Sequence, residues 1–271
     1  MNTFQKVIKY LAIAFAIFLT VSIIGGILGA VGLVGGLFTS GDAVLDDMQT
    51  YTVSEQITNL EVSINAADFT IKQADSFSVE SNLKHLTVEE NNGVLKIKET
   101  KKFNGTYSDA VLILYIPKEF DFERADIITG AGKMTVDTLS AATLNLEFGA
   151  GEVQIESLIA TSSADIDGGA GKITIAGGSL NNLDLDMGVG QLNLTSAVLG
   201  NSEFDLGVGE TNIVLIGSKD DYKIDAEKGI GSITVDGKTV SDFDSIGSGN
   251  NRIDIDGGIG AINLSFEESS H

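Results

Sequence analysis

Carboxylate side chains stand at fixed positions before a repeated pair of glycines, and they are the groups of this sequence best suited to chemistry. Before the G-x-G motifs that begin at Gly169, Gly188 and Gly207, acidic residues occupy the positions two and four residues upstream. Calcium prefers several carboxylate oxygens, and a basic peptide is attracted by the same groups. The candidate ligands for a divalent cation or a basic partner are Asp165, Asp167, Asp184, Asp186, Glu203 and Asp205.

This acidic pattern extends over seven motifs, and twelve of its fourteen positions hold Asp or Glu. If strands stack these positions, each neighbouring like-charge pair costs up to about 1 kcal/mol in water before screening by salt. Aspartate is also a poor strand former. One interpretation is a ladder that binds cations or a basic partner. The alternative is a solvated face that keeps the protein soluble and prevents sideways aggregation.

Other catalytic chemistries find little support in the sequence. The chain has no cysteine, and its two histidines are His85 and His271. A phosphate-binding loop needs a helix after its glycines, whereas alternating apolar residues follow them here. Calcium-binding β-roll repeats need an aspartate where Ile173 and Ile262 stand. We therefore predict no catalytic or cofactor-binding residues and no enzyme activity; a polysaccharide-acting enzyme, the minor alternative, would need one unique carboxylate pair in a cleft.

The motif G-[AVI]-G-x-h-x-h, in which h is mostly apolar, recurs at intervals of 19, 20, 19, 19, 22 and 29 residues. Apolar residues alternate with polar ones on both sides of the glycines, which indicates strands. A constant period of 19–20 residues favours coils that stack in parallel, each covering the apolar face of the next. We predict an all-β fold, a parallel β-solenoid. The motifs begin at Gly130, Gly149, Gly169, Gly188, Gly207, Gly229 and Gly258.

Two further columns support this stacking. Glycine suits the corner between the strands because it accepts positive φ and lets backbones pass closely. The third position after the second glycine is polar in every repeat, so stacked Thr and Asn side chains can hydrogen-bond to their equivalents in the next coil. These residues are Thr135, Gln154, Thr174, Asn193, Asn212, Thr234 and Asn263.

The region before the regular repeats contains irregular copies of the same motif. Leu60–Ile71 matches Leu144–Ile155, with Asn65 and Ala67 in place of the glycines. Leu86–Ile97 is predicted to form two strands, and Ala110–Ile116 a fully buried one. We assign 56–124 to irregular N-terminal coils that cap the fold. Residues 125–271 form the regular solenoid, with an insertion near 236–251.

Residues Tyr10–Phe38 carry no charge and are long enough to span a bilayer as one helix. Lys6 and Lys9 precede this run and Asp42 follows it, so residues 1–9 are expected in the cytoplasm and the C-terminal part outside the cell. Residues 39–55 form a linker. A cleaved signal peptide is the rival interpretation, but its apolar core is usually ~7–15 residues.

The charge of the chain restricts its partners. The net charge is −21, and all 38 acidic residues lie at or after Asp42. Such a surface repels nucleic acid and attracts cations or basic peptides. The sequence therefore predicts no nucleic-acid partner.

The repeated h-x-h-x-x-G-[AVI]-G-x-h-x-h units, from about Thr52 to Phe266, resemble the bacterial "putative adhesin" domain of unknown function. LiaG-like envelope-stress accessory proteins carry this domain behind a single membrane helix. The resemblance implies a β-solenoid and supplies no site residues. We expect a non-catalytic binding or scaffold module of the bacterial cell envelope, with a membrane protein, cationic peptide or wall polymer as partner. The alternative is an adhesive or structural surface protein.

Overall fold

The computed structural model describes residues 44–54, 56–100, 109–240 and 245–268. The predicted anchor, Tyr10–Phe38, lies outside these ranges, as do residues 1–9 and, within the predicted linker, residues 39–43 and 55. The described part of the linker contains the first strand, Val44–Thr52. None of the described residues form a helix with the length and hydropathy that a membrane span requires.

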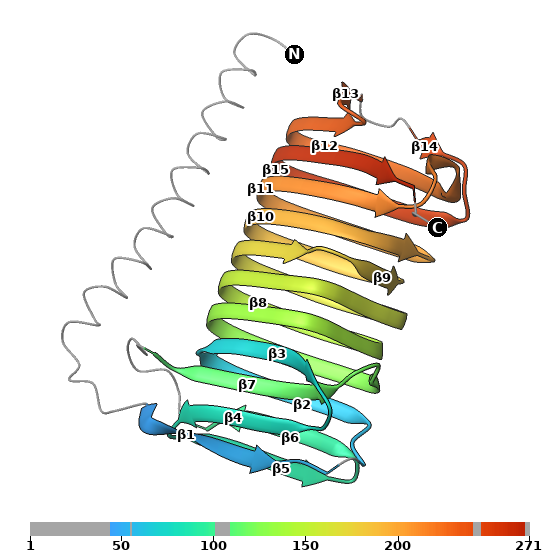
Figure 1. The fold of residues 1–271 in the computed structure, drawn as a ribbon. Helices are drawn as coiled ribbons and strands as arrows, with labels where there is room; N and C mark the ends of the chain where they lie inside the picture. Colours follow the sequence, from blue (N-terminus) through green and yellow to red (C-terminus); the bar gives the residue numbers. More distant parts are fainter. Residues whose placement is uncertain (1–43, 55, 101–108, 241–244, 269–271) are drawn as a thin grey trace, which may run out of the picture.

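The middle of the described chain is a stack of parallel coils, each made of a strand half, a glycine corner and a second strand half (Figure 1). Strands β8 (Asp121–Ile175), β10 (Leu183–Leu199) and β11 (Asn201–Ile216) follow one another in the stack. Asp184 of β10 pairs with Asp165 below it and with Glu203 above it. Residues 19 apart in the sequence are therefore paired in adjacent coils, as the repeat period predicts.

The corners require glycine for two reasons, both visible at Gly190. Its φ is +148°, a backbone conformation that side-chain-bearing residues rarely adopt. A Cβ atom placed on it would also collide with the carbonyl oxygen of Gly171 in the coil below. The glycines thus allow successive corners to stack in direct backbone contact.

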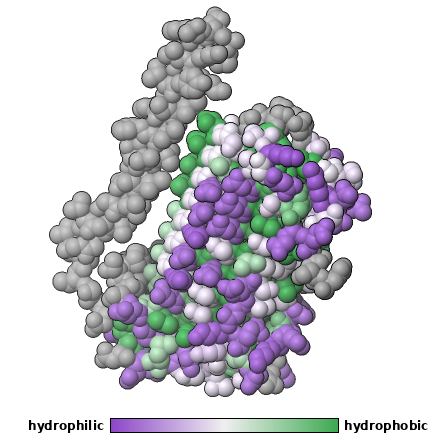
Figure 2. Space-filling view, turned by 45° about the horizontal axis from the view of Figure 1, so that its top comes forward, coloured by the Kyte–Doolittle hydropathy of each residue, from purple (hydrophilic) through white to green (hydrophobic). Residues whose placement is uncertain are grey.

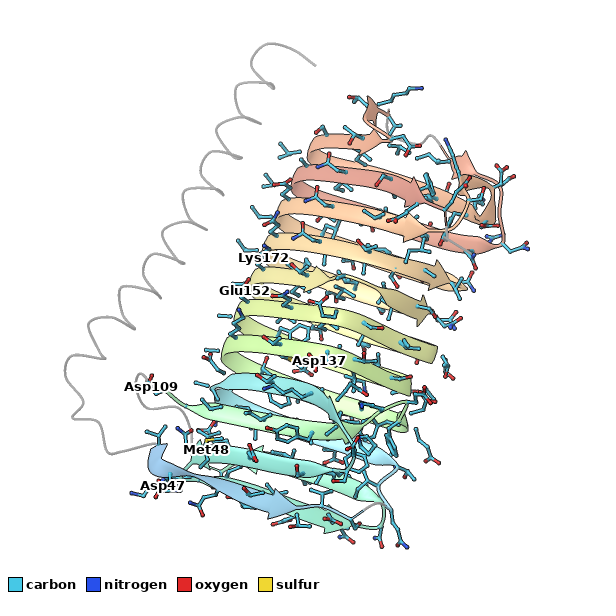
Figure 3. The ribbon with its side chains drawn as sticks, in the orientation of Figure 1. Asp47, Met48, Asp109, Asp137, Glu152 and Lys172 are labelled. Carbon is cyan, nitrogen blue, oxygen red and sulfur yellow. The ribbon has the colours of Figure 1, made fainter. Side chains whose placement is uncertain are left out.

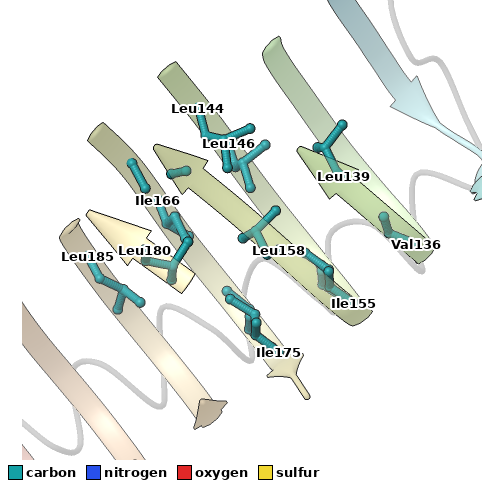
Figure 4. Close-up of a cluster of buried hydrophobic side chains, with 14 of the residues drawn as sticks. Val136, Leu139, Leu144, Leu146, Ile155, Leu158, Ile166, Ile175, Leu180 and Leu185 are labelled. Atoms are coloured by element: carbon teal, nitrogen blue, oxygen red, sulfur yellow. The ribbon is translucent and has the colours of Figure 1, made fainter. Parts of the chain in front are cut away.

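Inward-facing apolar residues form one continuous core along the stack. The column three residues before each motif is buried throughout; Ile127, Leu146 and Ile166 are each at most 1% exposed. Figure 4 shows part of this core, where Leu146, Ile166 and Leu185 lie in successive coils beside Leu158 and Leu180. The alternation of buried and exposed residues follows from the two-residue period of a strand.

The last two coils do not stack in sequence order. Strand β15 (Asn251–Glu267) pairs with β11 on one side and with β12 (Tyr222–Val235) on the other. The C-terminal coil therefore lies between two coils that precede it, and the expectation of strictly successive stacking is wrong here. The segment predicted as an insertion connects β12 to β15. It includes β13 (Lys238–Thr239) and β14 (Ile246–Gly247), which both pair antiparallel with β12.

The N-terminal end is built from seven shorter strands: β1 (Val44–Thr52), β2 (Asn59–Ala66), β3 (Asp68–Ala74), β4 (Ser78–Leu83), β5 (Leu86–Asn91), β6 (Val94–Glu99) and β7 (Val111–Pro117). The first coil consists of β2 and β3, which both stack on β8. The predicted strand pair β5–β6 is a hairpin. Strand β7 is buried on alternate residues rather than fully, because only one of its faces meets the core.

A carboxylate closes the corner of the first coil. The register between β2 and β6 ends before this corner, at Ser63 and Lys98. Glu99, 5% exposed, accepts hydrogen bonds from the backbone N–H groups of Asn65 and Ala66, at 2.8 and 3.4 Å. It takes the place of the carbonyl groups of a further coil.

The remaining elements are β9 (Gly178–Asn181), which extends the coil between β8 and β10, and a short 3-10 helix at Lys219–Asp221. Together the strands form one 15-stranded mixed sheet, with antiparallel pairs at both ends of the parallel stack. The prediction of an all-β fold is confirmed.

Candidate functional site

The strand halves before the corners carry the predicted acidic residues on their outward side. The register brings Asp165, Asp184 and Glu203 into one column. Asp167, Asp186 and Asp205 form a second column, two residues along each strand. We call these two rows the acidic columns. All six candidate residues are exposed, and the structure brings all of them together on one face.

The out-of-order coil continues both acidic columns without a break. Glu203 pairs with Asp254 of β15, which in turn pairs with Asp225 of β12. In the second column Asp205 pairs with Asp256, and Asp256 with Glu227. Five successive coils therefore present two carboxylates each, although the last two have exchanged places.

The pKa values of two carboxyl groups in these columns are raised. For Asp165 the main cause is partial burial of the group among its neighbours, followed by the negative charges of Asp167 and Asp184. Partial burial is also the main cause for Asp186, followed by the charges of Asp205, Asp184 and Asp167. Both effects disfavour the ionised form. A cation bound between the coils would relieve the repulsion.

One cluster within the columns brings three carboxylates close enough to hold a metal ion. One carboxylate oxygen each of Glu203, Asp205 and Asp256 lie within 4.8 Å of one another. Three convergent carboxylates match the preference of calcium for oxygen ligands. Of these three residues, Asp256 is not among the candidate ligands predicted from the sequence. The repeat alignment did align it with Asp205, but only the fold shows that the two are neighbours.

The strand halves after the corners present a different outward face, which is turned to the viewer in Figure 1. Here Asn212 donates a hydrogen bond from Nδ2 to Oδ1 of Asn193 (3.0 Å), and Asn263 donates to Asn212 (2.9 Å). Asn193 donates to Thr174 (3.5 Å), and the hydroxyl of Thr234 donates to Asn263 (2.8 Å). We call this row the amide ladder. The predicted hydrogen bonding between coils is confirmed for these five residues, in the order that the exchanged coils impose, whereas Gln154 donates to Glu156 of its own strand.

Charges next to the corners on this second face alternate in sign. Figure 3 shows Glu152 and Lys172 at the corner edge of neighbouring coils. Lys133 forms an ion pair with Glu152 at 3.8 Å. In Figure 2 hydrophilic side chains spread over this side of the stack, with hydrophobic ones between them. The single-signed charge is thus a property of the acidic columns and not of the whole surface.

These features define a class of protein: a β-fold of parallel coils with glycine corners and repetitive outer faces. The chain belongs to the toastrack DUF4097 family, whose model matches residues 57–245. The resemblance to a "putative adhesin" domain of unknown function, inferred from the repeats, is confirmed. No protein with a curated description matches the chain.

Several solved structures are similar to this chain at low sequence identity, and the first of the following, whose TM-score exceeds 0.5, shares its fold. A "putative adhesin" from Bacteroides fragilis is 14% identical with a TM-score of 0.52, over 80% of this chain and 96% of that one. A "putative cell adhesion protein" from Clostridium sporogenes is 15% identical with a TM-score of 0.31, over 82% and 99% of the two chains. A "putative adhesin" from Parabacteroides distasonis is 10% identical with a TM-score of 0.40, over 82% and 96%.

Proposed function

We propose that this protein is a non-catalytic β-solenoid held at the outer side of a bacterial cell membrane, where it serves as a binding or scaffold module of the envelope. Tyr10–Phe38 supplies the single membrane anchor, because its length and its lack of charge suit a bilayer. The lysines before it keep the N-terminus in the cytoplasm. A role in the response to envelope stress rests on the family resemblance alone.

The observation that carries the binding role is the register of the acidic columns. Stacked carboxylates repel one another and cost stability, up to about 1 kcal/mol for each neighbouring pair in water. The columns nevertheless run through five coils, including the exchanged pair β15 and β12. A divalent cation such as Ca²⁺ or Mg²⁺, or the basic segment of a partner protein, would offset this repulsion. Glu203, Asp205 and Asp256 are the best-placed ligands.

A catalytic role is less compatible with this arrangement. Acid–base catalysis by carboxylates needs two groups with different environments and different tasks. The acidic columns instead repeat the same two groups in each coil, so no pair is distinguished from its neighbours by position. A repeated surface of this kind suits a ligand or partner that is itself extended.

The test is thermal unfolding of the whole chain, purified in mild detergent, with calcium, magnesium or a chelator at constant ionic strength. We expect the unfolding midpoint to rise with calcium and to saturate. The double variant Asp205→Asn/Asp256→Asn should abolish this rise, whereas the control Asp121→Asn, an exposed carboxylate outside the columns, should retain it. An equal rise with monovalent salt would contradict a cation site and leave the columns as a solvated face.

The partner is tested separately, by recovering the protein from cells that produce it. Copurification of a membrane protein that depends on the acidic columns would support the scaffold role. Retention of the protein on purified cell wall, unchanged in the double variant, would favour the adhesive or structural role instead.

A further inference from the structure

The rows of outward residues that form the acidic columns continue past the five coils with two carboxylates each. At the N-terminal end of the stack these rows contain residues other than Asp and Glu. Through β8, β2 and β6, one column continues as Asp126, Glu61 and Lys96. The other continues as Ile128, Ser63 and Lys98. A face that is acidic for five coils thus carries two lysines on β6, and strand β5 follows with Glu89 opposite Lys96 and Thr87 opposite Lys98.

A hollow of about 400 Å³ lies over this end of the face. Ser63 is one of its lining residues and is in register with Lys98 on one side and Ile128 on the other, both of which have longer side chains and also line the hollow. The other polar lining residues are Glu61, Lys96, Arg124, Asp126, Asn145 and Glu147. Its size falls within the ~300–1,000 Å³ range of small-molecule sites.

Two of the charged pairs around the hollow are already satisfied. Arg124 donates from Nε to both carboxylate oxygens of Asp126, at 2.9 and 2.8 Å. Lys96 forms an ion pair with Glu61. By contrast, Lys98 and Glu147 form no ion pair with any residue that the structure describes. The hollow therefore offers one available cation and one available anion on opposite sides of Ser63 and Ile128.

Ile128 differs in residue type from the rest of its column. The equivalent positions of all six other regular coils hold Asp or Glu, whereas Ile128 is apolar and 44% exposed. An exposed aliphatic side chain gains ~25 cal/mol for each Å² that a ligand covers. The short Ser63, the available Lys98 and the exposed Ile128 thus break the pattern of the face at one place.

We propose that this hollow binds a short zwitterionic peptide with an apolar C-terminal residue. The peptide carboxylate binds the ammonium group of Lys98 and the hydroxyl of Ser63, and the apolar side chain packs on Ile128. The peptide amine points to Glu147. Ser63 and Glu147 are two strands apart, roughly 10 Å at ~4.8 Å per strand, which a tripeptide of ~3.4 Å per residue spans.

The probe is the tripeptide Ala-Ala-Leu, titrated into the whole detergent-purified chain by calorimetry. We expect saturable binding that Lys98→Gln weakens at least tenfold, whereas Lys72→Gln, which removes an exposed lysine elsewhere, leaves it unchanged. The C-terminal amide of the same peptide should also bind at least tenfold more weakly, since it lacks the carboxylate. Ile128→Ser should weaken Ala-Ala-Leu more than Ala-Ala-Ala.

Equal binding of the peptide acid and its amide would overturn the proposal, as would equal losses in Lys98→Gln and Lys72→Gln. An absence of saturable binding at millimolar peptide would also overturn it. The outcome is independent of the cation site: Asp205→Asn/Asp256→Asn should leave peptide binding intact, and Lys98→Gln should leave the calcium-dependent rise in unfolding temperature intact.

Discussion

The two outward faces of the stack are built on the same coils with the same spacing, yet stacking has opposite consequences for them. On the amide ladder each Asn both donates and accepts, so identical residues in register satisfy one another, as Asn193, Asn212 and Asn263 do. On the acidic columns each carboxylate only accepts, so identical residues in register repel. Repetition stabilises the first face and costs stability on the second. The acidic columns are therefore the face where a ligand would have most to contribute.

The corner holds both faces in register, and breaking it should have the largest effect. Gly190→Ala introduces a Cβ atom at φ +148° against the carbonyl group of Gly171, which the coil below cannot move without shifting its own corner. We expect a loss of at least about 3 kcal/mol in the free energy of unfolding, measured with urea.

The matched control for the corner is Gly237→Ala. Gly237 also has positive φ, +71°, but a Cβ atom there would meet nothing within 4 Å. We expect a loss of only ~1–2 kcal/mol from backbone strain. Equal losses at the two glycines would show that close stacking of the corners is unimportant.

Replacing one Asn of the amide ladder by Asp should convert a stabilising contact between coils into a repulsive one. Asn212→Asp removes the Nδ2 donor to Asn193 and places a negative charge beside Glu210. We expect a loss of about 1–3 kcal/mol in the free energy of unfolding. Asn104→Asp, which lies outside the described residues and outside the ladder, provides a variant with the same change of charge.

The reverse substitution on the acidic columns should have the opposite sign. Asp186→Asn removes a charge that repels Asp205 and Asp167 and should stabilise the protein by up to about 1 kcal/mol at low salt. The gain should shrink as the ionic strength rises, because salt screens exposed charges. Urea unfolding at two salt concentrations measures this. A gain that does not depend on salt would point to strand propensity rather than charge as its source.

The smallest effect should be seen in the dependence of stability on pH. The folded-state pKa values of Asp165 and Asp186 are raised above the ordinary value of 3.8, so the folded state retains their protons to higher pH than the unfolded state does. Their contribution to stability is thus greatest in acid and is lost as the pH rises through the raised values. Unfolding midpoints measured upward from pH 4 should fall less steeply in Asp186→Asn than in the unchanged protein.

Local chemistry made much of this protein predictable from its sequence. The glycine motif and the two-residue alternation identified the strands, the corners and the buried column that contains Leu146 and Ile166. The amide ladder was predictable because an Asn stacked on an Asn forms a hydrogen bond in any parallel coil. The acidic residues were predictable as candidate ligands because their place relative to the glycines sets the side on which they emerge.

The tertiary structure decided the matters that depend on which coil meets which. The units of β12 and β15 both carry Asp or Glu, glycine and Thr or Asn at the matching positions, so either could stack on β11 with the same columns in register. Repeats this similar determine the register in which coils pair but not the order in which the coils stack. The connection that begins at Asp236 is long enough for β15 to lie between β11 and β12. The neighbourhood of Asp205 and Asp256, the carboxylate of Glu99 beneath the first corner, and the hollow over Ser63 all arise from contacts between non-successive segments, for which a repeat pattern contains no signal.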